Sequence, residues 1–120
     1  LPDTIAVLGA GLNLSWFGAP WLREKEIGYW GDLDTWGLQM LAHARRLQPK
    51  VEAILMNYAV FEAHGPGLAV NEDTPASPEP PDGLSEEERA LYCHLRSQPK
   101  GRLEQEFLPE ADVAKAFLHW

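Results

Sequence analysis

Two aspartates separated by a single residue are the part of this sequence best suited to chemistry. Asp32 and Asp34 follow a short apolar stretch and precede an amphipathic one, so a strand is expected before them and a helix after them. This arrangement places both carboxylates at the carboxyl edge of a sheet, where open α/β folds bind ligands. Two carboxylates so close repel each other by roughly 1 kcal/mol even in water. A hard divalent cation such as Mg²⁺ removes that repulsion and prefers carboxylate, water and phosphate oxygens as ligands.

The same two residues also have a purely structural interpretation. Aspartate is common in turns and at helix N-caps, and either Asp34 or Thr35 can cap the helix that follows. The spacing alone therefore leaves two interpretations open, a Mg²⁺ site for phosphate chemistry and a polar turn with a helix cap.

The elements that must position the aspartates alternate between strand and helix. Continuous apolar runs predict three strands, at residues 4–8, 27–30 and 51–56. Helices are expected over residues 12–17, from the aspartates to Pro49, and over residues 58–64 up to Gly65-Pro66-Gly67. The alternation with short connections predicts an α/β fold, a parallel sheet flanked by helices.

The composition changes after residue 67. Residues 68–83 are rich in proline and acidic side chains, which predicts an extended loop rather than a packed element. Ser85 and Glu88 have the spacing of a capping box at the start of the next helix. Pro109 starts a last helix, for which four residues are expected to face inward: Val113, Ala114, Phe117 and Leu118. We expect one domain with an α/β core over residues 1–67, a loop over 68–83 and a helical extension over 84–120 that packs on the core.

The overall composition narrows the class of protein. The chain has 120 residues and a net charge of −8, which argues against broad, nonspecific binding to nucleic acid or anionic membranes. It leaves open a local site that meets phosphate through a metal. No apolar run approaches the ~18 residues of a membrane span, and the single cysteine fits a reducing compartment, so a cytoplasmic protein without a membrane partner is expected. Because the chain starts without methionine, we expect it to be a domain of a longer protein.

The stretch Y-W-G-D-L-D-T-W-G at residues 29–37 resembles the Toprim domain of topoisomerase VI A subunits and of the meiotic Spo-eleven proteins, which carry G-D-x-D-x-x-G. The chain is more closely similar to the C-terminal domain of JetD, the nuclease subunit of the bacterial Wadjet anti-plasmid system. That closer match rests on Leu55-Met56, on L-S-E-E-E at residues 84–88 and on R-L-E-Q-E at residues 102–106, in the family's order.

The resemblance implies a Toprim-like fold and a metal-dependent DNA endonuclease. Asp32 and Asp34 match the pair that holds Mg²⁺ (or Mn²⁺) in such domains, and they are the expected catalytic residues. The family's glutamate, from the strand before this pair, has no match here. We therefore expect the chain to lack its first strand and to be inactive alone. Trp36 and Asn57 stand where histidine and aspartate are common, which makes a second metal doubtful.

Other residues are assigned lesser roles. Asn57, Arg102, Glu104 and Glu106 are candidates for supporting the site, and the last three can instead form a salt-bridged structural lock for the C-terminal helices. Tyr29 is expected to pack rather than to react, so the nucleophile is unknown.

The resemblance also implies partners, namely double-stranded DNA, an SMC-like ATPase complex of the same system, and a second copy of the protein in a homodimer. Two alternative functions stay open. One is a structural or interaction domain that keeps the Toprim shape without chemistry, and the other is a DNA transesterase domain like that of topoisomerase VI.

Overall fold

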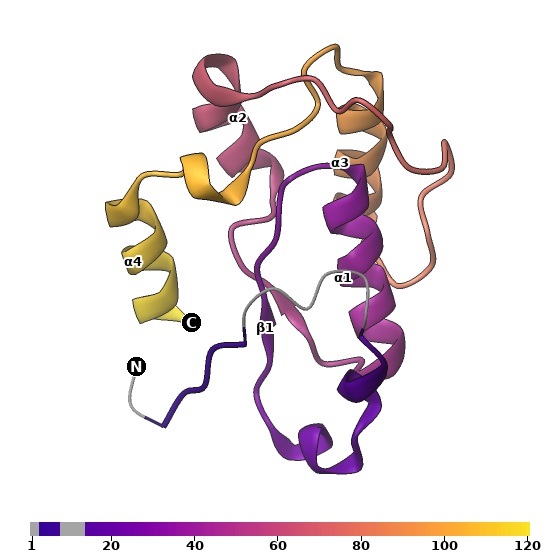
Figure 1. Cartoon of the computed structure of the whole chain (residues 1–120), viewed down its shortest axis with the longest axis vertical. Helices are drawn as coiled ribbons and strands as arrows, with labels where there is room; N and C mark the ends of the chain where they lie inside the picture. Colours follow the sequence, from indigo (N-terminus) through magenta and orange to yellow (C-terminus); the bar gives the residue numbers. More distant parts are fainter. Residues whose placement is uncertain (1–2, 8–13) are drawn as a thin grey trace.

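Two short parallel strands lie between the helices of the molecule (Figure 1). The structure is a computed structural model that describes residues 3–7 and 14–120. Strand β1 (Gly28–Tyr29) pairs with β2 (Glu52–Ala53), with Gly28 opposite Glu52 and Tyr29 opposite Ala53. The helices are α1 (Thr35–Leu47), α2 (Tyr58–Leu68), α3 (Glu86–Ser97) and α4 (Glu110–His119). Short 3₁₀ helices cover Ser15–Gly18, Pro20–Glu24 and Gln105–Phe107. The small α/β fold with a parallel sheet is confirmed.

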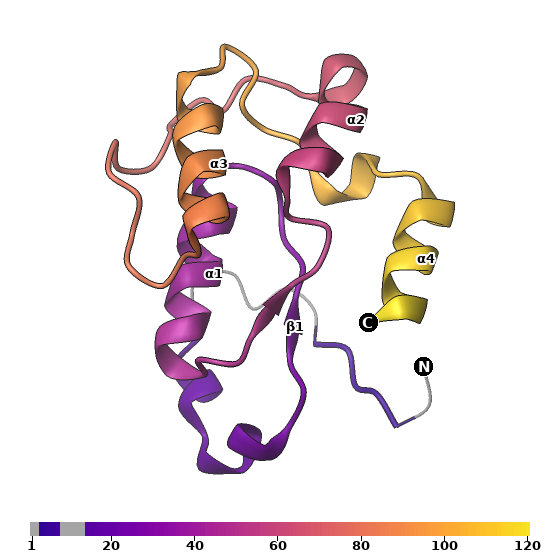
Figure 2. The same ribbon diagram turned by 180° about the vertical axis from the view of Figure 1, so that it is seen from behind.

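Helices α1 and α3 lie side by side on one side of the strands, and α4 lies on the other, as the front and back views agree (Figures 1 and 2). Buried side chains of α1 and α3 form the centre of the core: Leu38, Leu41, Leu91, Tyr92 and Leu95. Their spacing of three and four residues is that of one helix face, as the sequence pattern predicts.

Both long helices begin with the caps that their sequences encode. The Asp34 carboxylate accepts a hydrogen bond from the Gly37 N–H at the start of α1. At the start of α3, Ser85 and Glu88 form the predicted capping box. Arg45 of α1 forms an ion pair with Glu88, so the same carboxylate caps α3 and ties it to α1.

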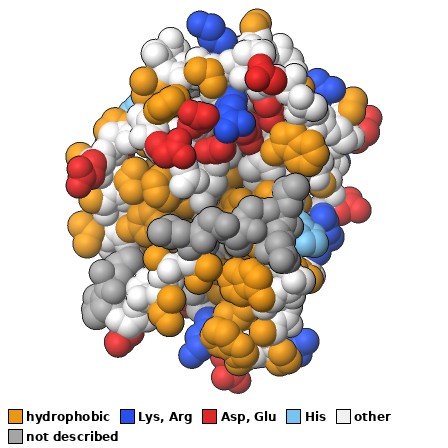
Figure 3. Space-filling model, in the orientation of Figure 1, with side chains coloured by type: hydrophobic (Ala, Val, Ile, Leu, Met, Phe, Trp, Pro, Cys, Tyr) orange, Lys and Arg blue, Asp and Glu red, His pale blue; other side chains and the backbone are white. Residues whose placement is uncertain are grey.

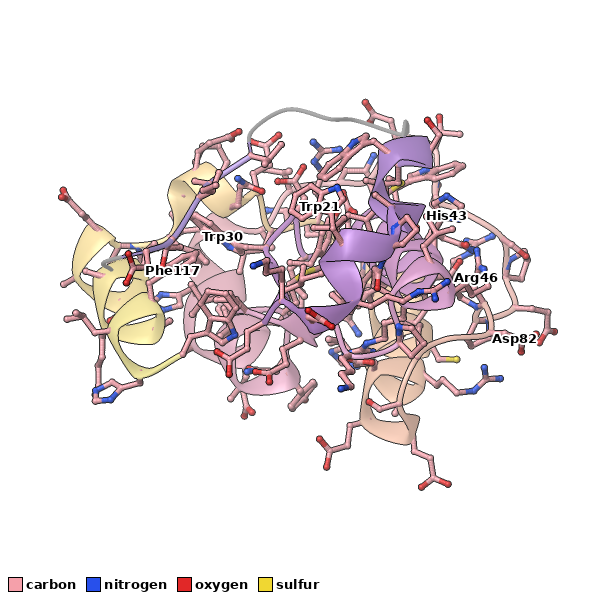
Figure 4. All side chains as sticks on the ribbon, turned by 90° about the horizontal axis from the view of Figure 1, so that it is seen from below. Trp21, Trp30, His43, Arg46, Asp82 and Phe117 are labelled. Atoms are coloured by element: carbon pink, nitrogen blue, oxygen red, sulfur yellow. The ribbon has the colours of Figure 1, made fainter. Side chains whose placement is uncertain are left out.

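Contacts from α4 and from the loop before α3 complete the fold. Phe117 of α4 packs edge to face on Trp30, just after β1, with ring centres 5.7 Å apart (Figure 4). On the other side of the molecule, Arg46 of α1 donates to the backbone carbonyl of Asp82 over 2.7 Å. Side-chain contacts therefore attach both α4 and the loop before α3 to the rest of the domain.

The strand predicted at residues 4–8 is not formed where it is described. Residues 4–7 contain no strand, and Ile5 is 87% exposed. A run of β-branched residues becomes a strand only when a neighbour pairs with its backbone and covers its side chains. Residue 8, the end of that predicted strand, and the first part of the helix predicted over 12–17 lie outside the described residues. The strand predicted over 51–56 is short because Leu55 has a φ of 58°, which interrupts the extended backbone.

Two further expectations were wrong in detail. Helix α2 does not end at Gly65-Pro66-Gly67 but continues to Leu68. Pro66 removes one donor, yet Gly65 is buried against the Phe61 ring and its carbonyl accepts from the Ala69 N–H over 2.7 Å, which keeps the last turn closed. In α4, Ala114 and Leu118 are exposed rather than inward-facing, because the packed face of this helix is the one that carries the half-buried Phe117, which contacts Trp30.

The loop at residues 68–83 is more than a solvated linker. Within it, Glu72 and Ala76 are buried. An isolated antiparallel bridge joins Val70 to Arg102. Part of this loop is therefore a packed layer of the domain.

No helix within the described residues is long and apolar enough to cross a membrane.

Candidate functional site

Asp34 is the most buried carboxylate of the pair, with 2% of its surface exposed. Its Oδ1 accepts from the Gly37 N–H over 2.6 Å, and its Oδ2 lies 3.5 Å from Nη1 of Arg102. Burial raises its pKa from 3.8 to about 6, and the neighbouring carboxylates of Glu72 and Asp32 add to the rise, while the Gly37 N–H and Arg102 oppose it. The net rise means that the cost of burying the charged carboxylate outweighs the stabilisation that the Gly37 N–H and Arg102 give it.

Asp32 lies in the middle of the loop between β1 and α1 and is more exposed than Asp34. Its Oδ1 accepts from the backbone N–H of Gln105 over 3.0 Å, and its Oδ2 accepts from Nη2 of Arg102 over 3.2 Å. The structure therefore brings Asp32, Asp34 and Arg102 together, although Arg102 is 70 residues from Asp32 along the chain. Nη2 of Arg102 also lies 3.2 Å from Oε1 of Glu104, so three carboxylates surround one guanidinium. Figure 3 shows acidic side chains gathered around a basic one on this face, over the loop between β1 and α1.

The backbone on both sides of this cluster is tied down. Leu33, between the aspartates, forms an antiparallel bridge with Leu103, with N–H to carbonyl distances of 2.9 and 3.0 Å. Arg102 forms the same kind of bridge with Val70, over 2.7 and 3.0 Å. Residues 102–103 thus link the loop after β1 to the loop after α2.

A second buried carboxylate, Glu72, lies at the N-terminus of α1. It accepts from the Thr35 hydroxyl over 2.7 Å and from the Thr35 and Trp36 N–H groups over 3.4 Å each. The Thr35 hydroxyl oxygen accepts in turn from the Ala76 N–H over 2.8 Å. The first N–H groups of the helix therefore meet carboxylates, which the helix dipole favours.

Gly37 is required by the close approach of the aspartate loop. A Cβ at Gly37 would lie 1.9 Å from the carbonyl oxygen of Asp32, far inside any real contact. Nearby, the Tyr29 hydroxyl folds over Gly31, where an added Cβ would lie 2.9 Å from it. Burial, with the charges of Asp32 and Asp34, raises the pKa of Tyr29 to about 12.

The donor set fits one hard divalent cation with an open coordination shell. Asp32 and Asp34 offer carboxylate oxygens, and Glu72 and Glu104 add negative charge close by. No group of three or more His, Cys, Asp or Glu side chains within the described residues is arranged to hold a metal ion. Asp32 and Asp34 could hold a cation whose remaining positions would be filled by water and substrate oxygens, the coordination that Mg²⁺ commonly adopts.

A family model described as "Wadjet protein JetD, C-terminal" matches residues 1–117. The chain belongs to this JetD C-terminal family. Membership associates it with the Wadjet system and implies that it works with other components of that system. No curated protein is significantly similar to the chain.

Two other residues that were predicted to support the site, Asn57 and Glu106, make no contact with Asp32, Asp34 or Arg102 among the bonds of the described residues. The Asn57 side chain accepts from the Val60 N–H over 2.9 Å and caps α2. Glu106 is exposed in the 3₁₀ helix Gln105–Phe107. Arg102 does form an ion pair with Glu104. The other carboxylates that Arg102 contacts are those of the two aspartates, not side chains of the C-terminal helices.

Three contributors to the site were missed from the sequence. Glu72 lies in a proline-rich stretch where acidic side chains are usually solvated, and no pattern marks it as buried. Thr35 was considered only as a cap, whereas its hydroxyl joins Glu72 to Ala76. Gln105 contributes its backbone N–H, which carries no side-chain signal at all.

Proposed function

We propose that this JetD C-terminal domain is a Toprim-type domain that cleaves phosphodiester bonds of double-stranded DNA with Mg²⁺ or Mn²⁺ held by Asp32 and Asp34. The observation that carries the proposal is the convergence of these two carboxylates on a single positive group, after the carboxyl end of β1. The family membership supports it, because the resemblance implies a nuclease role for such domains.

The buried Asp34 and the more exposed Asp32 are proposed to have different roles in the site. Asp32 and Asp34 would hold the divalent cation, which when bound would supply a Lewis acid for a phosphoryl oxygen and for the charge that develops on it. Asp34 is held rigidly by the Gly37 N–H and the surrounding core, so it fixes the position of the site. Asp32 has the more exposed side chain, so it is the carboxylate of the pair that a substrate could approach. The acidic surface leaves substrate binding to this local site and to partner proteins.

We propose hydrolysis rather than transesterification, which would need a tyrosine from an upstream DNA-binding domain. Tyr29 is not proposed as the nucleophile, because its hydroxyl is packed over Gly31 and burial raises its pKa to about 12. We therefore propose water as the nucleophile. The proposed partners are an SMC-like ATPase complex of the Wadjet system and a second copy of the protein.

One observation favours a second candidate function, a non-catalytic interaction domain with the Toprim shape. Arg102 already neutralises part of the charge of Asp32 and Asp34, as a structural ion-pair cluster would. In that case the aspartates serve only to cap α1 and to anchor residues 102–105.

Plasmid cleavage separates the two functions. The protein at its full natural length, with the other Wadjet components and Mg²⁺ or Mn²⁺, is compared with its Asp32→Asn and Asp34→Asn variants. Asp73→Asn is the matched control, because Asp73 is exposed and, among the described residues, its carboxylate accepts a hydrogen bond only from the Asn71 side chain. We expect both site variants to fold and to lose cutting, and the control to cut normally. Cutting at the wild-type rate by both site variants would leave only the interaction domain.

A further inference from the structure

Arg102 occupies the place between the aspartates that a cation would take. We propose that a divalent cation displaces the Arg102 side chain from Asp32 and Asp34, and that the released guanidinium then binds a phosphate of the DNA. The inference rests on the proposed function and adds a substrate-binding residue to it. Two guanidinium nitrogens of Arg102 lie 3.2 and 3.5 Å from one oxygen of each aspartate. A cation bound to the same two oxygens has no room beside this guanidinium and repels its charge.

The Arg102 side chain can leave while its backbone stays. The two antiparallel bridges, Val70 with Arg102 and Leu33 with Leu103, fix the main chain on both sides. The side chain itself is 34% exposed, so it already reaches solvent. Its Nε has no hydrogen-bond partner in the described part of the chain. The guanidinium group of Arg102 therefore makes only some of its possible hydrogen bonds in its present position. Rotation about the bonds of the side chain is enough to bring it to new partners.

The guanidinium group of Arg102, once released, is suited to bind a phosphate. Arginine presents a planar fork of donors that matches phosphate oxygens, and it stays charged at every physiological pH. Glu104, 3.2 Å from Nη2, sits beside the aspartates and can hold the side chain close to the site during the exchange. The released Arg102 thus remains within reach of a phosphodiester that meets the cation.

Metal binding without any turnover tests the exchange. Mn²⁺ alone is titrated calorimetrically into the protein at its full natural length, comparing wild type, Arg102→Gln and Arg89→Gln. Arg89 is an exposed arginine whose guanidinium, within residues 3–7 and 14–120, donates a hydrogen bond only to the Pro81 carbonyl, so its loss matches the change in net charge. We expect Arg102→Gln to bind Mn²⁺ about tenfold more tightly than wild type, because a competing cation has been removed. Arg89→Gln is expected to match wild type.

Melting temperatures give a second reading that does not depend on the titration. In EDTA, Arg102→Gln is expected to melt below wild type, because Asp32 and Asp34 lose their counter-charge. Saturating Mn²⁺ is expected to raise the melting temperature of Arg102→Gln by more than that of wild type. Arg102→Lys, which keeps the charge, is expected to bind Mn²⁺ nearly as wild type does. If the glutamine variant does not fold, Arg102→Met, which also removes the charge, takes its place and is expected to show the same gain in Mn²⁺ affinity.

Binding to a duplex oligonucleotide tests the second half of the proposal. Fluorescence anisotropy is measured with Ca²⁺ and with EDTA. Wild type is expected to gain duplex affinity when Ca²⁺ is present, and Arg102→Gln to lose that gain.

The outcomes separate this inference from the function on which it rests. If wild type binds Mn²⁺ and Arg102→Gln binds it equally or less tightly, the exchange is refuted while the metal site stands. If Arg102→Gln binds Mn²⁺ more tightly but keeps the gain in duplex affinity, Arg102 competes with the cation without touching DNA, and the proposal is overturned in that half. If neither protein binds Mn²⁺ more tightly than the Asp32→Asn, Asp34→Asn double variant, the proposed metal site falls as well.

Discussion

Substitution of Gly37 by alanine is the sharpest perturbation that this structure offers. The added Cβ would lie 1.9 Å from the Asp32 carbonyl oxygen and 3.2 Å from Oδ1 of Asp34. Real Cβ atoms essentially never approach another atom closer than 3.0 Å, so the backbone at Asp32 must retreat by at least about 1.1 Å, the difference between 3.0 and 1.9 Å. Because the obstructing atom belongs to the backbone, no side-chain rotation relieves the contact.

The cost of that retreat follows from what the loop holds in place. Overpacking of this kind usually destabilises a protein by about 1–3 kcal/mol. For a chain of this size, 2 kcal/mol corresponds to a fall in melting temperature of roughly 6–12 °C. A displacement of about 1 Å at a reacting centre lowers activity by about a hundredfold. We therefore expect Gly37→Ala to lose much more cutting activity than stability.

Gly67→Ala is the matched control for this experiment. Gly67 lies within α2, and a Cβ there meets nothing within 4 Å. Since alanine is the better helix former by about 1 kcal/mol, this variant is expected to be as stable as wild type or slightly more so. Urea denaturation and plasmid cleavage are measured on all three proteins. A Gly37→Ala variant with the stability and activity of wild type would refute the close approach of the Asp32 carbonyl and the site geometry built on it.

Two other perturbations address the buried polar groups. Burial raises the pKa of Asp34 from 3.8 to about 6, so the folded state holds this proton more tightly, and the free energy of unfolding falls by up to about 3 kcal/mol as the pH rises between these values. The stability of Asp34→Asn relative to wild type is thus expected to be greater at about pH 7 than at about pH 4 by urea denaturation, and an equal difference at both would contradict the raised pKa. Thr35→Val leaves the Glu72 carboxylate and the Ala76 N–H without their shared hydroxyl, so we expect a loss of about 1–3 kcal/mol and faster amide exchange at Ala76. Thr35→Ser, which keeps the hydroxyl, should behave almost as wild type, and equal exchange in all three proteins would show that the bond is not made.

Local signals in the sequence predicted their elements well. The helix start after Asp34 and the capping box of Ser85 with Glu88 depend on residues three apart, so the structure repeats the expected bonds. The inward faces of α1 and α3 also follow from helical spacing alone. The strand predicted at residues 4–8 failed at residues 4–7 because β-branched composition cannot supply a pairing neighbour.

The residues of the candidate site also fall into those that a local motif predicts and those that depend on contacts between distant parts of the chain. Asp32 and Asp34 were found because both lie in one short motif, and Arg102 and Glu104 were singled out only through a family resemblance. That Arg102 reaches the aspartates depends on the antiparallel bridges, which have no local sequence signature. The burial of Glu72 likewise depends on how the loop at residues 68–83 folds back over α1.

The bridges that join residues 102–103 to the aspartate loop also determine when the site can exist during synthesis. Asp32 finds its guanidinium partner 70 residues later in the chain, and its backbone donor Gln105 73 residues later. While the chain emerges from the ribosome, β1, α1 and their aspartates are therefore complete long before the segment that neutralises and covers them. Burying Asp34 at that stage is costly, so the N-terminal half is expected to stay loosely folded until residue 105 is available. Completion of the site and completion of the fold are then one cooperative event, and a chain that stops before residue 102 carries the motif but not its environment.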